Sequence, residues 1–295
     1  MSANRESTVA VIGLGAIGLP VAVNLAKKGS VVQGFNRSEK NKEIARAAGV
    51  VIKETLAEVD AKIIFTVLPD MPQVTEVLEN GLRNNMKPGD IFVVMGTVSP
   101  VAMKKLATEL EAQGIRVLDA PVSGGDVGAK NGTLSIMVGG EEAVFNAALP
   151  YFEQMGTTIR LLGPVGSGEF AKAANQIIVA ITLTALAEAV TLGRNSGLDT
   201  TVLLDILAGG LAGSQALKVK REKIESHDFT PGGSSIFQLK DLRFALEAGA
   251  ENGTALPITK AVTELYSSLV EHGDGALDHS AIIREIERLS REQQH

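Results

Sequence analysis

The pattern of hydrophobic and polar positions divides the chain into two halves. From residue 8 to about 163, short β-branched runs alternate with stretches of helical periodicity, which predicts βαβ units around a mostly parallel sheet. Continuously apolar runs such as Ile63–Phe65 are typical of strands covered on both faces. The predicted strands are Val9–Ile12, Val31–Phe35, Lys62–Val67, Ile91–Met95, Arg116–Asp119, Leu134–Val138 and Ile159–Leu162. Predicted helices between them include Ile17–Lys28, Gln73–Asn80, Val101–Gln113 and Glu141–Gln154.

The second half carries no strand pattern after Gly166. Glu169–Asn195 is one long helical pattern rich in Ala, Ile and Leu. Further helices are predicted near 200–208, 214–225, 237–252, 256–272 and 279–291. The sequence therefore predicts an α/β domain over residues 1–164 and an all-α domain over residues 165–295 that begins with the long helix.

Composition excludes several kinds of site and partner. With 28 Lys+Arg against 34 Asp+Glu the net charge is −6, which argues against a nucleic-acid partner. The chain has no Cys and four scattered His residues, so we expect no disulfide and no metal site. The start of the chain is polar, and the apolar run Ile177–Ala187 is shorter than the ~20 residues of a membrane span. We therefore expect a cytoplasmic protein without membrane contact.

A glycine-rich motif lies between the first predicted strand and the first predicted helix. Its residues are Gly13, Leu14, Gly15, Ala16, Ile17 and Gly18, which match the spacing GxGxxG. In this context the glycines allow a tight turn, close approach of a pyrophosphate to the backbone, and close packing of helix on strand. The helix N-terminus then faces the anion. The motif predicts a dinucleotide cofactor; the alternative is a glycine-rich turn without a ligand.

The end of the second predicted strand bears on the choice of cofactor. Asn36 stands 23 residues after Gly13, about where an NAD site places an acidic residue for the ribose hydroxyls. Arg37 and Ser38 follow, and an arginine can pair with a ribose 2′-phosphate. NADP(H) is therefore favoured, with NAD(H) possible. The alternative is that Arg37 is an exposed residue that caps the next helix.

Three further segments follow predicted strands and are expected at the same edge of the sheet, where ligands bind in open α/β sheets. Two of them supply Leu68, Pro69 and Thr97 as candidate cofactor contacts. The third contains Ser123, Gly124 and Gly125, whose hydroxyl and N–H groups suit a substrate carboxylate. A tight turn with purely steric glycines is the alternative for this third segment.

Polar residues interrupt the apolar long helix near its start. The polar cluster consists of Lys172, Asn175 and Gln176, and Lys172 and Asn175 are three residues apart and share a face. Gly168 one turn earlier is expected to leave room for a ligand. Lys240-Asp241 is a second polar pair in the same half of the chain. The alternatives are a lysine that extends to solvent from an apolar helix, and an ordinary surface charge pair.

Together these motifs resemble the β-hydroxyacid dehydrogenase family over nearly the whole chain. The segments that carry the resemblance are Gly13–Pro20 with Asn24-Leu25, Asp119–Gly125, Gly166–Gly168 through Lys172 and Asn175, and Lys240–Leu242. The resemblance implies a Rossmann-type domain joined by a long helix to an all-α domain that makes dimer contacts, so a homodimer or homotetramer is expected. It also implies that Lys172 is catalytic, that Ser123, Gly124, Gly125, Asn175 and Lys240 hold the substrate, and that Lys240 also contacts the cofactor.

The chemistry of hydride transfer fits these residues. Reduction of a carbonyl builds negative charge on oxygen, which the ammonium of Lys172 can stabilise and protonate. Lys240 would be a second cation that lowers the pKa of Lys172. Residues Ala212–Ser214 and Asp228–Gly232 resemble tartronate semialdehyde reductases within the family, whereas Gly233–Ser235 replaces a usually more apolar stretch. The expected substrate is a small carboxylate, tartronate semialdehyde.

Alternatives to this substrate and to this class of protein remain. Succinic semialdehyde, glyoxylate and 3-hydroxyisobutyrate (methylmalonate semialdehyde) are alternative substrates. An imine reductase is disfavoured by Lys172, because those relatives usually carry another residue there. A cofactor-sensing binding module is the non-enzymatic alternative.

Overall fold

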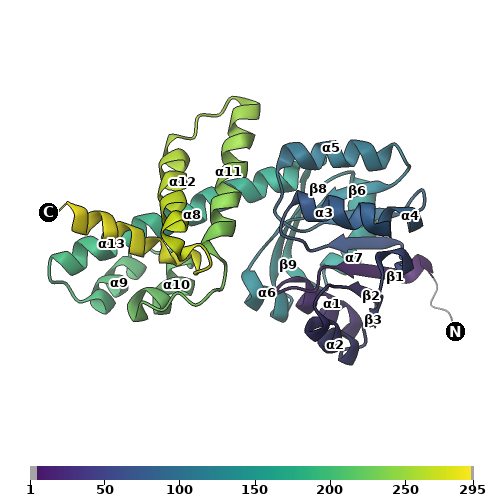
Figure 1. Cartoon of the computed structure of the whole chain (residues 1–295), viewed down its shortest axis with the longest axis horizontal. Coiled ribbons are helices and arrows are strands. Elements are labelled where there is room, and N and C mark those ends of the chain that lie inside the picture. Colours follow the sequence, from purple (N-terminus) through teal and green to yellow (C-terminus); the bar gives the residue numbers. More distant parts are fainter. Residues whose placement is uncertain (1–4, 294–295) are drawn as a thin grey trace. The chain divides into compact units, whose positions relative to one another are not determined.

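The computed structural model describes residues 5–293 and divides into two compact units that meet at Lys172–Ala173. The first unit is an α/β structure and the second is all-α (Figure 1). This agrees with the fold class predicted from the sequence.

A largely parallel sheet forms the centre of the first unit. The strand order is β3-β2-β1-β4-β5-β6-β8-β7, with β9 pairing to β8. Pairings from β3 across to β6 are parallel, β8 is antiparallel to β6 and β7, and β9 is parallel to β8. The strands are β1 (Thr8–Ile12), β2 (Val31–Phe35), β3 (Val51–Ile52), β4 (Ile63–Thr66), β5 (Ile91–Val94), β6 (Arg116–Asp119), β7 (Val122–Ser123), β8 (Leu134–Gly139) and β9 (Gly156–Gly163).

Helices cover both faces of this sheet. Alternate residues of β1 contribute to two separate cores: Val9 and Val11 pack on one face, Ala10 and Ile12 on the other. Helices α1 and α2 lie on one side of the sheet and α3 and α5 on the opposite side (Figure 1). The helices are α1 (Gly18–Lys27), α2 (Glu39–Ala47), α3 (Met71–Val77), α4 (Arg83–Asn85), α5 (Pro100–Glu111), α6 (Gly125–Asn131) and α7 (Glu142–Phe152), with short helical segments at Arg5–Ser7, Leu56–Glu58 and Leu78–Leu82.

The structure corrects the predicted elements of this unit in four places. The strands β3 and β7 are only two residues long, too short for a periodicity signal. Helix α6 forms in a glycine-rich segment for which the sequence predicted no helix. Helix α3 begins earlier and ends earlier than predicted: the side chain of Asp70 caps its first N–H, and a kinked segment at Leu78–Leu82 follows it.

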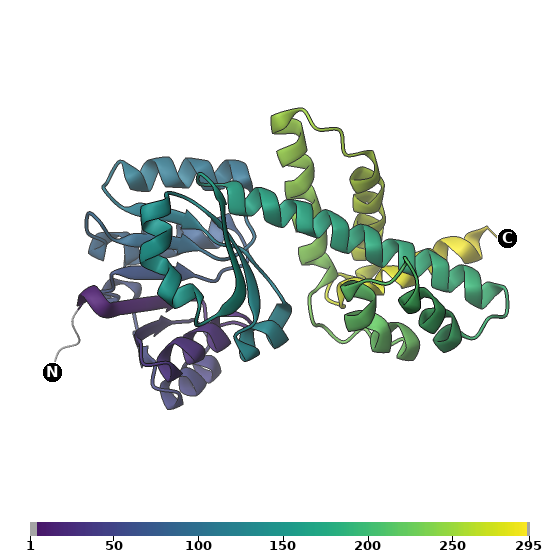
Figure 2. The ribbon, with the colours of Figure 1, turned by 180° about the vertical axis from the view of Figure 1, so that it is seen from behind.

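The second unit is built around the long helix α8 (Ser167–Asn195), whose first residues belong to the first unit (Figure 2). Ala180, Leu183 and Val190 of α8 are fully or almost fully buried in the core of the second unit. The other helices are α9 (Thr200–Gly209), α10 (Gln215–Ser226), α11 (Ser235–Asn252), α12 (Pro257–Leu269) and α13 (Ile282–Glu292), with short helical segments at Val270–Asp274 and His279–Ala281.

Helix α8 is longer than the apolar run counted in the sequence. At 29 residues it is long and apolar enough to cross a membrane by length and composition alone, although Ile177–Ala187 by itself is not. A single helix of this kind is weak evidence, because the core helix of a globular protein passes the same test. The buried residues of α8 pack with residues of the other helices in the core of the second unit.

Candidate active site

Five segments that follow parallel strands gather at one edge of the first unit. They follow β1, β2, β4, β5 and β6, whose pairings are all parallel, so their carboxyl ends face the same way. This edge holds the glycine motif, residues 36–38, Leu68-Pro69, Thr97 and the segment that begins at Ala120. The strand order reverses at β1, between β2 and β4, which is where open α/β sheets bind their ligands.

The three glycines of the motif have three different surroundings. Gly13 has a φ of 96°, and a side chain there would collide with the carbonyl oxygen of Val67. A Cβ at Gly18 would overlap the carbonyl oxygen of Gly13, which lets α1 begin close against the strand end. A Cβ at Gly15 would meet nothing within 4 Å. The open side of the turn is therefore at Gly15, and this geometry fits a pyrophosphate that approaches the backbone there.

Two asparagines hold the glycine-rich turn from the neighbouring segment. Oδ1 of Asn36 accepts a hydrogen bond from the Leu14 N–H at 3.1 Å, and Nδ2 of Asn41 donates to the Leu14 carbonyl at 2.6 Å. Asn36 thus supports the turn through its own amide, at the position where an acidic residue would contact ribose. Asn41 was not among the predicted residues. Its signal in the sequence is weak: Asn41 lies in the stretch that forms α2, and asparagine is unfavourable inside a helix.

Arg37 lies on the surface of the first unit. Its side chain is 81% exposed, and Nη1 lies 3.9 Å from the Glu76 carboxylate of α3. Ser38 occupies the position before α2, and its carbonyl accepts hydrogen bonds from the Asn36 side chain and the Lys42 N–H. An exposed, loosely paired guanidinium can change partner at little cost, because exposed ion pairs contribute little.

The segments after β4 and β5 pack tightly on each other. A Cβ at Gly96 would overlap the carbonyl oxygen of Leu68. The backbone just before Thr97 is therefore in direct contact with the backbone just before Pro69. The next residue, Val98, donates its N–H to the Glu169 carboxylate at 3.2 Å. This bond ties the candidate cofactor segment to the first turn of α8.

A buried carboxylate at the first residue of the Asp119–Gly125 motif fixes the start of α8. Asp119, at the end of β6, accepts hydrogen bonds from the N–H groups of Gly166 at 2.7 Å and Glu169 at 2.8 Å. Its side chain is fully buried, and this burial raises the pKa of Asp119 even though the backbone hydrogen bonds oppose the shift. Its signal was an acidic residue that ends an apolar strand.

The close packing of α8 against Asp119 corrects the role expected of Gly168. The sequence suggested that Gly168 leaves room for a ligand. In the structure a Cβ at Gly168 would collide with the carbonyl oxygen of Met137 and with the carboxylate of Asp119. The protein's own atoms fill this space, so Gly168 serves close packing of α8 against the sheet.

Lys172 lies beside the predicted carboxylate-binding segment. Only 7% of the residue is exposed, and Nζ donates a hydrogen bond to the Val122 carbonyl at 2.9 Å. Ser123 follows Val122 in β7 and pairs with Ser135 of β8. At Gly125, the first residue of α6, a side chain would meet nothing within 4 Å. The first unit thus places the Lys172 ammonium beside the strand that leads into Ser123, Gly124 and Gly125, and the substrate roles of these residues stay predictions.

The second unit contains the remaining predicted residues, Asn175 of α8 and Lys240 of α11. Nδ2 of Asn175 donates to the Gln176 side chain at 2.9 Å. Nζ of Lys240 lies 3.2 Å from the Asp241 carboxylate and 4.8 Å from the centre of the Phe244 ring. The Lys240-Asp241 pair is largely buried, so the alternative of an ordinary surface charge pair is wrong. The effect of Lys240 on the pKa of Lys172 stays a prediction.

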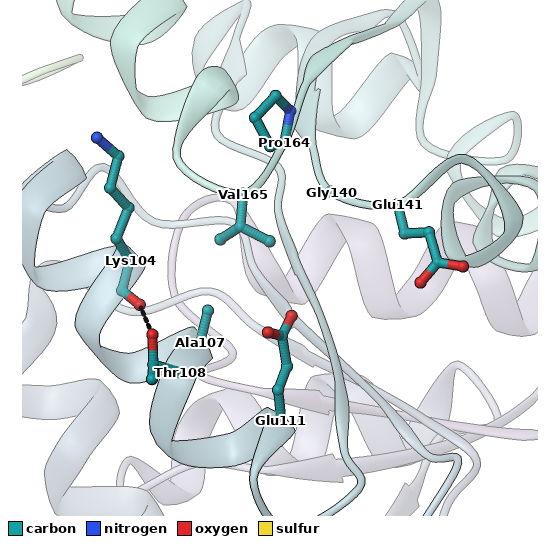
Figure 3. Close-up of a pocket in the computed structure, with 8 residues that line it drawn as sticks. All are labelled: Lys104, Ala107, Thr108, Glu111, Gly140, Glu141, Pro164 and Val165. Carbon is teal, nitrogen blue, oxygen red and sulfur yellow. Dashed lines mark hydrogen bonds between the residues drawn. The ribbon is translucent and has the colours of Figure 1, made fainter.

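A surface pocket of about 400 Å³ in the first unit has a different lining (Figure 3). It is bounded by Lys104, Ala107, Thr108 and Glu111 of α5 and by Gly140, Glu141, Pro164 and Val165. The hydrogen bond drawn there joins the Thr108 hydroxyl to the Lys104 carbonyl within α5. None of the predicted site residues lines this pocket, so it is separate from the candidate site.

Known proteins resemble both units. The model for the NAD-binding domain of 6-phosphogluconate dehydrogenase matches residues 8–163. The model for the NAD-binding region of NADP-dependent 3-hydroxyisobutyrate dehydrogenase matches residues 166–286. These two matches account for nearly the whole chain.

Individual relatives agree with the family models. The chain is 40% identical to 2-hydroxy-3-oxopropionate reductase of Escherichia coli, over 95% of this chain and 97% of that protein. It is 38% identical to 2-(hydroxymethyl)glutarate dehydrogenase of Eubacterium barkeri, over 97% of each chain. The solved structure of Mycobacterium tuberculosis 3-hydroxyisobutyrate dehydrogenase with L-serine superposes with a TM-score of 0.85 at 31% identity, over 95% of this chain and 99% of that one. The chain therefore belongs to the β-hydroxyacid dehydrogenases of the 3-hydroxyisobutyrate dehydrogenase type and is an NAD(P)-dependent oxidoreductase.

Proposed function

We propose that this enzyme reduces tartronate semialdehyde (2-hydroxy-3-oxopropionate) to glycerate with NADPH. The observation that carries the proposal is the position of Lys172, whose ammonium lies 2.9 Å from the Val122 carbonyl, next to Ser123. The likeness to the 2-hydroxy-3-oxopropionate reductase of Escherichia coli supports this choice of substrate.

The proposal gives each residue a chemical task. A bound nicotinamide supplies the hydride that reduces the aldehyde carbon. Lys172 stabilises the developing charge on the carbonyl oxygen and donates the proton that completes the alcohol. The Ser123 hydroxyl and the N–H groups of Gly124 and Gly125 hold the carboxylate, which fixes the face of the carbonyl. Asn175 and Lys240 also bind the substrate in this proposal.

The preference for NADPH rests on Arg37 and Asn36. Arg37 is exposed and only loosely paired with Glu76, so it is available to a 2′-phosphate. Asn36 brings no negative charge, and its amide supports the glycine-rich turn. An acidic residue at position 36 would repel the phosphate.

Initial rates with tartronate semialdehyde, measured with NADPH and NADH at matched concentrations, test both parts of the proposal. We expect good turnover and a strong preference for NADPH. Equal turnover with NADH would refute the role of Arg37 and leave the substrate standing. Failure with both cofactors would refute the substrate. Succinic semialdehyde, glyoxylate, 3-hydroxyisobutyrate and cyclic imines are then the compounds to assay.

A Lys172→Ala variant tests the chemistry itself. General acid catalysis contributes about 10²- to 10⁴-fold, so kcat is expected to fall by about 10³-fold. The Kd for NADPH, measured by fluorescence titration, is expected to stay within about twofold, and Lys105→Ala on the exposed side of α5 is the matched control. Wild-type kcat in Lys172→Ala would refute the catalytic assignment.

We further propose that the enzyme is a cytoplasmic homodimer or homotetramer that associates through its helical unit. Large apolar side chains of this unit are exposed on α8 and α9 and on the connection between them: Ile178, Leu192, Leu198, Val202 and Ile206. Exposed apolar area of this kind is typical of subunit contacts. Light scattering after size exclusion is expected to give a mass of at least twice 30.9 kDa. A monomer would refute this part.

A further inference from the structure

Two buried polar side chains of the second unit lie where α8 and α11 face each other. Gln176 of α8 is 9% exposed and Asp241 of α11 is 6% exposed. Burial of an amide and a carboxylate on apolar helices costs free energy unless each finds a hydrogen-bond partner. In this structure they find each other: Nε2 of Gln176 donates to Oδ2 of Asp241 at 2.6 Å.

The remaining oxygen atom of each side chain contacts one of the two predicted substrate residues of the unit. Oε1 of Gln176 accepts the hydrogen bond from Nδ2 of Asn175 at 2.9 Å. Oδ1 of Asp241 lies 3.2 Å from Nζ of Lys240. A single chain of contacts thus runs from Asn175 through Gln176 and Asp241 to Lys240.

The chemistry of the two middle residues suits this arrangement. A glutamine side chain can accept from one neighbour and donate to another, and a carboxylate can accept an amide hydrogen with one oxygen while it pairs with an ammonium through the other. Because one N–H of Asn175 points to Gln176, the orientation of its amide is fixed. Lys240 is likewise held between the Asp241 carboxylate and the face of the Phe244 ring.

A further layer supports Gln176 from α11. Gln238 is almost fully buried, and its Nε2 donates to the Gln176 carbonyl at 3.4 Å. Its Oε1 lies 3.1 Å from Nδ1 of His279. These contacts limit the rotation of α8 against α11 near Gln176.

We propose that Gln176 and Asp241 are positioning residues for substrate binding: together they fix the amide of Asn175 and the ammonium of Lys240. The proposal rests on the substrate-binding roles given to Asn175 and Lys240 above. Neither Gln176 nor Asp241 touches the substrate in it. They act through their neighbours, because a preorganised binding group loses less entropy when the substrate arrives.

A double-mutant cycle tests the coupling of Gln176 to Asn175. The variants are Gln176→Leu, Asn175→Ala and the pair, assayed for kcat/KM with NADPH and whichever substrate the wild type turns over. Gln176→Leu is expected to lower kcat/KM at least tenfold, mainly through KM, but less than threefold in the Asn175→Ala background. Gln176→Leu is expected to lower the Tm to the same extent in both backgrounds, because the buried Asp241 carboxylate loses its amide donor in each. Gln215→Leu, the same change at an exposed glutamine of the second unit, is the control.

The cycle separates this proposal from the function on which it rests. A wild-type kcat/KM in Asn175→Ala would overturn the binding role of Asn175 and the positioning role with it. A clear loss in Asn175→Ala, with an equal further loss from Gln176→Leu in both backgrounds, would overturn the positioning role alone.

Exchange of the two side chains gives a second test that does not depend on how well leucine packs. Gln176→Glu alone places two carboxylates together and is expected to lower kcat/KM at least tenfold. Adding Asp241→Asn restores one amide and one carboxylate with the hydrogen bond reversed. We expect Gln176→Glu/Asp241→Asn to recover at least fivefold over Gln176→Glu. Absence of recovery in a variant with wild-type Tm would overturn the proposal.

Discussion

Asp119 in the first unit and Asp278 in the second are both fully buried, but the groups that hold them differ. Asp119 accepts hydrogen bonds from the backbone N–H groups of Gly166 and Glu169, and its burial raises its pKa. Asp278 is also penalised by burial, but the hydrogen bond from the Lys220 ammonium at 2.7 Å and further groups, including Ser280, lower its pKa overall.

The difference extends to the two units as a whole. The candidate site in the first unit is built largely from backbone: a glycine-rich turn, strand ends and helix starts. In the second unit the candidate residues depend on side chains that hold other side chains, such as Gln176 and Asp241. Backbone donors satisfy a carboxylate without neutralising it, whereas a paired ammonium also supplies the opposite charge.

Removal of each carboxylate is expected to give the largest contrast. Asp278→Asn leaves the Lys220 ammonium buried without its anion, and loss of one partner from a buried pair costs about 3–5 kcal/mol. Asp119→Asn keeps one carbonyl acceptor and relieves the buried charge, so we expect a loss of about 1–2 kcal/mol. Hydrogen exchange read by mass spectrometry reports the free energy of opening for each unit separately. Equal losses would refute the distinction between the two aspartates.

Two alanine substitutions test how far the first unit depends on its backbone. In Gly18→Ala the new Cβ overlaps the Gly13 carbonyl, so we expect the free energy of unfolding to fall by about 3 kcal/mol. In Gly15→Ala the Cβ meets nothing within 4 Å, and stability is expected to stay within about 1 kcal/mol. The Kd for NADPH is expected to rise at least about tenfold in Gly15→Ala, because its Cβ occupies the side open to the pyrophosphate. Unchanged affinity in Gly15→Ala would place the cofactor elsewhere.

These contrasts explain which features the sequence could predict. The fold class, the order of the major elements and the glycine motif follow from periodicity and from local backbone needs. Gly168 was misread because its neighbours, Met137 and Asp119, come from distant strands. Gln176 and Asp241 are visible in the sequence only as polar residues beside Asn175 and Lys240, and Asn41 only as an asparagine within a helix. The bonds from Asn41 to Leu14 and from Gln176 to Asp241 join residues that only the folded chain brings near.

Arg37 provides the opposite case to Lys220, because it is an exposed cation that contributes little to stability. Arg37→Ala is expected to change the free energy of unfolding by less than about 0.5 kcal/mol. Loss of a charge-assisted contact with a 2′-phosphate costs about 1.5–3 kcal/mol, which lowers kcat/KM for NADPH by about 10- to 100-fold and leaves NADH unaffected. Arg46→Ala, also an exposed arginine, is the control. An equal loss of kcat/KM with NADPH and NADH would show that Arg37 does not bind the 2′-phosphate.

The smallest effects are the pH dependences of the two units, and they are expected to have opposite signs. The pKa of Asp119 is raised above the unfolded value near 3.9. Between the unfolded and the native pKa the native state keeps a proton that the unfolded chain has lost. The stability of the first unit therefore falls as the pH rises through this interval. Because the pKa of Asp278 is lowered, the unfolded chain takes up a proton first, and stability falls as the pH drops below about 4.

A single substitution can make the second aspartate resemble the first. Lys220→Met removes the ammonium and leaves Asp278 with the N–H groups of Gly232 and Ser280 and the Ser280 hydroxyl. Burial then opposes ionisation with less compensation, so the pKa of Asp278 is expected to rise. Hydrogen exchange of the second unit between pH 3 and 6 is expected to lose its decline in stability toward acid, while the first unit keeps its own profile. An unchanged acid decline would mean that neutral donors alone hold Asp278 ionised, and the contrast with Asp119 would then come from the number of those donors and not from the charge of Lys220.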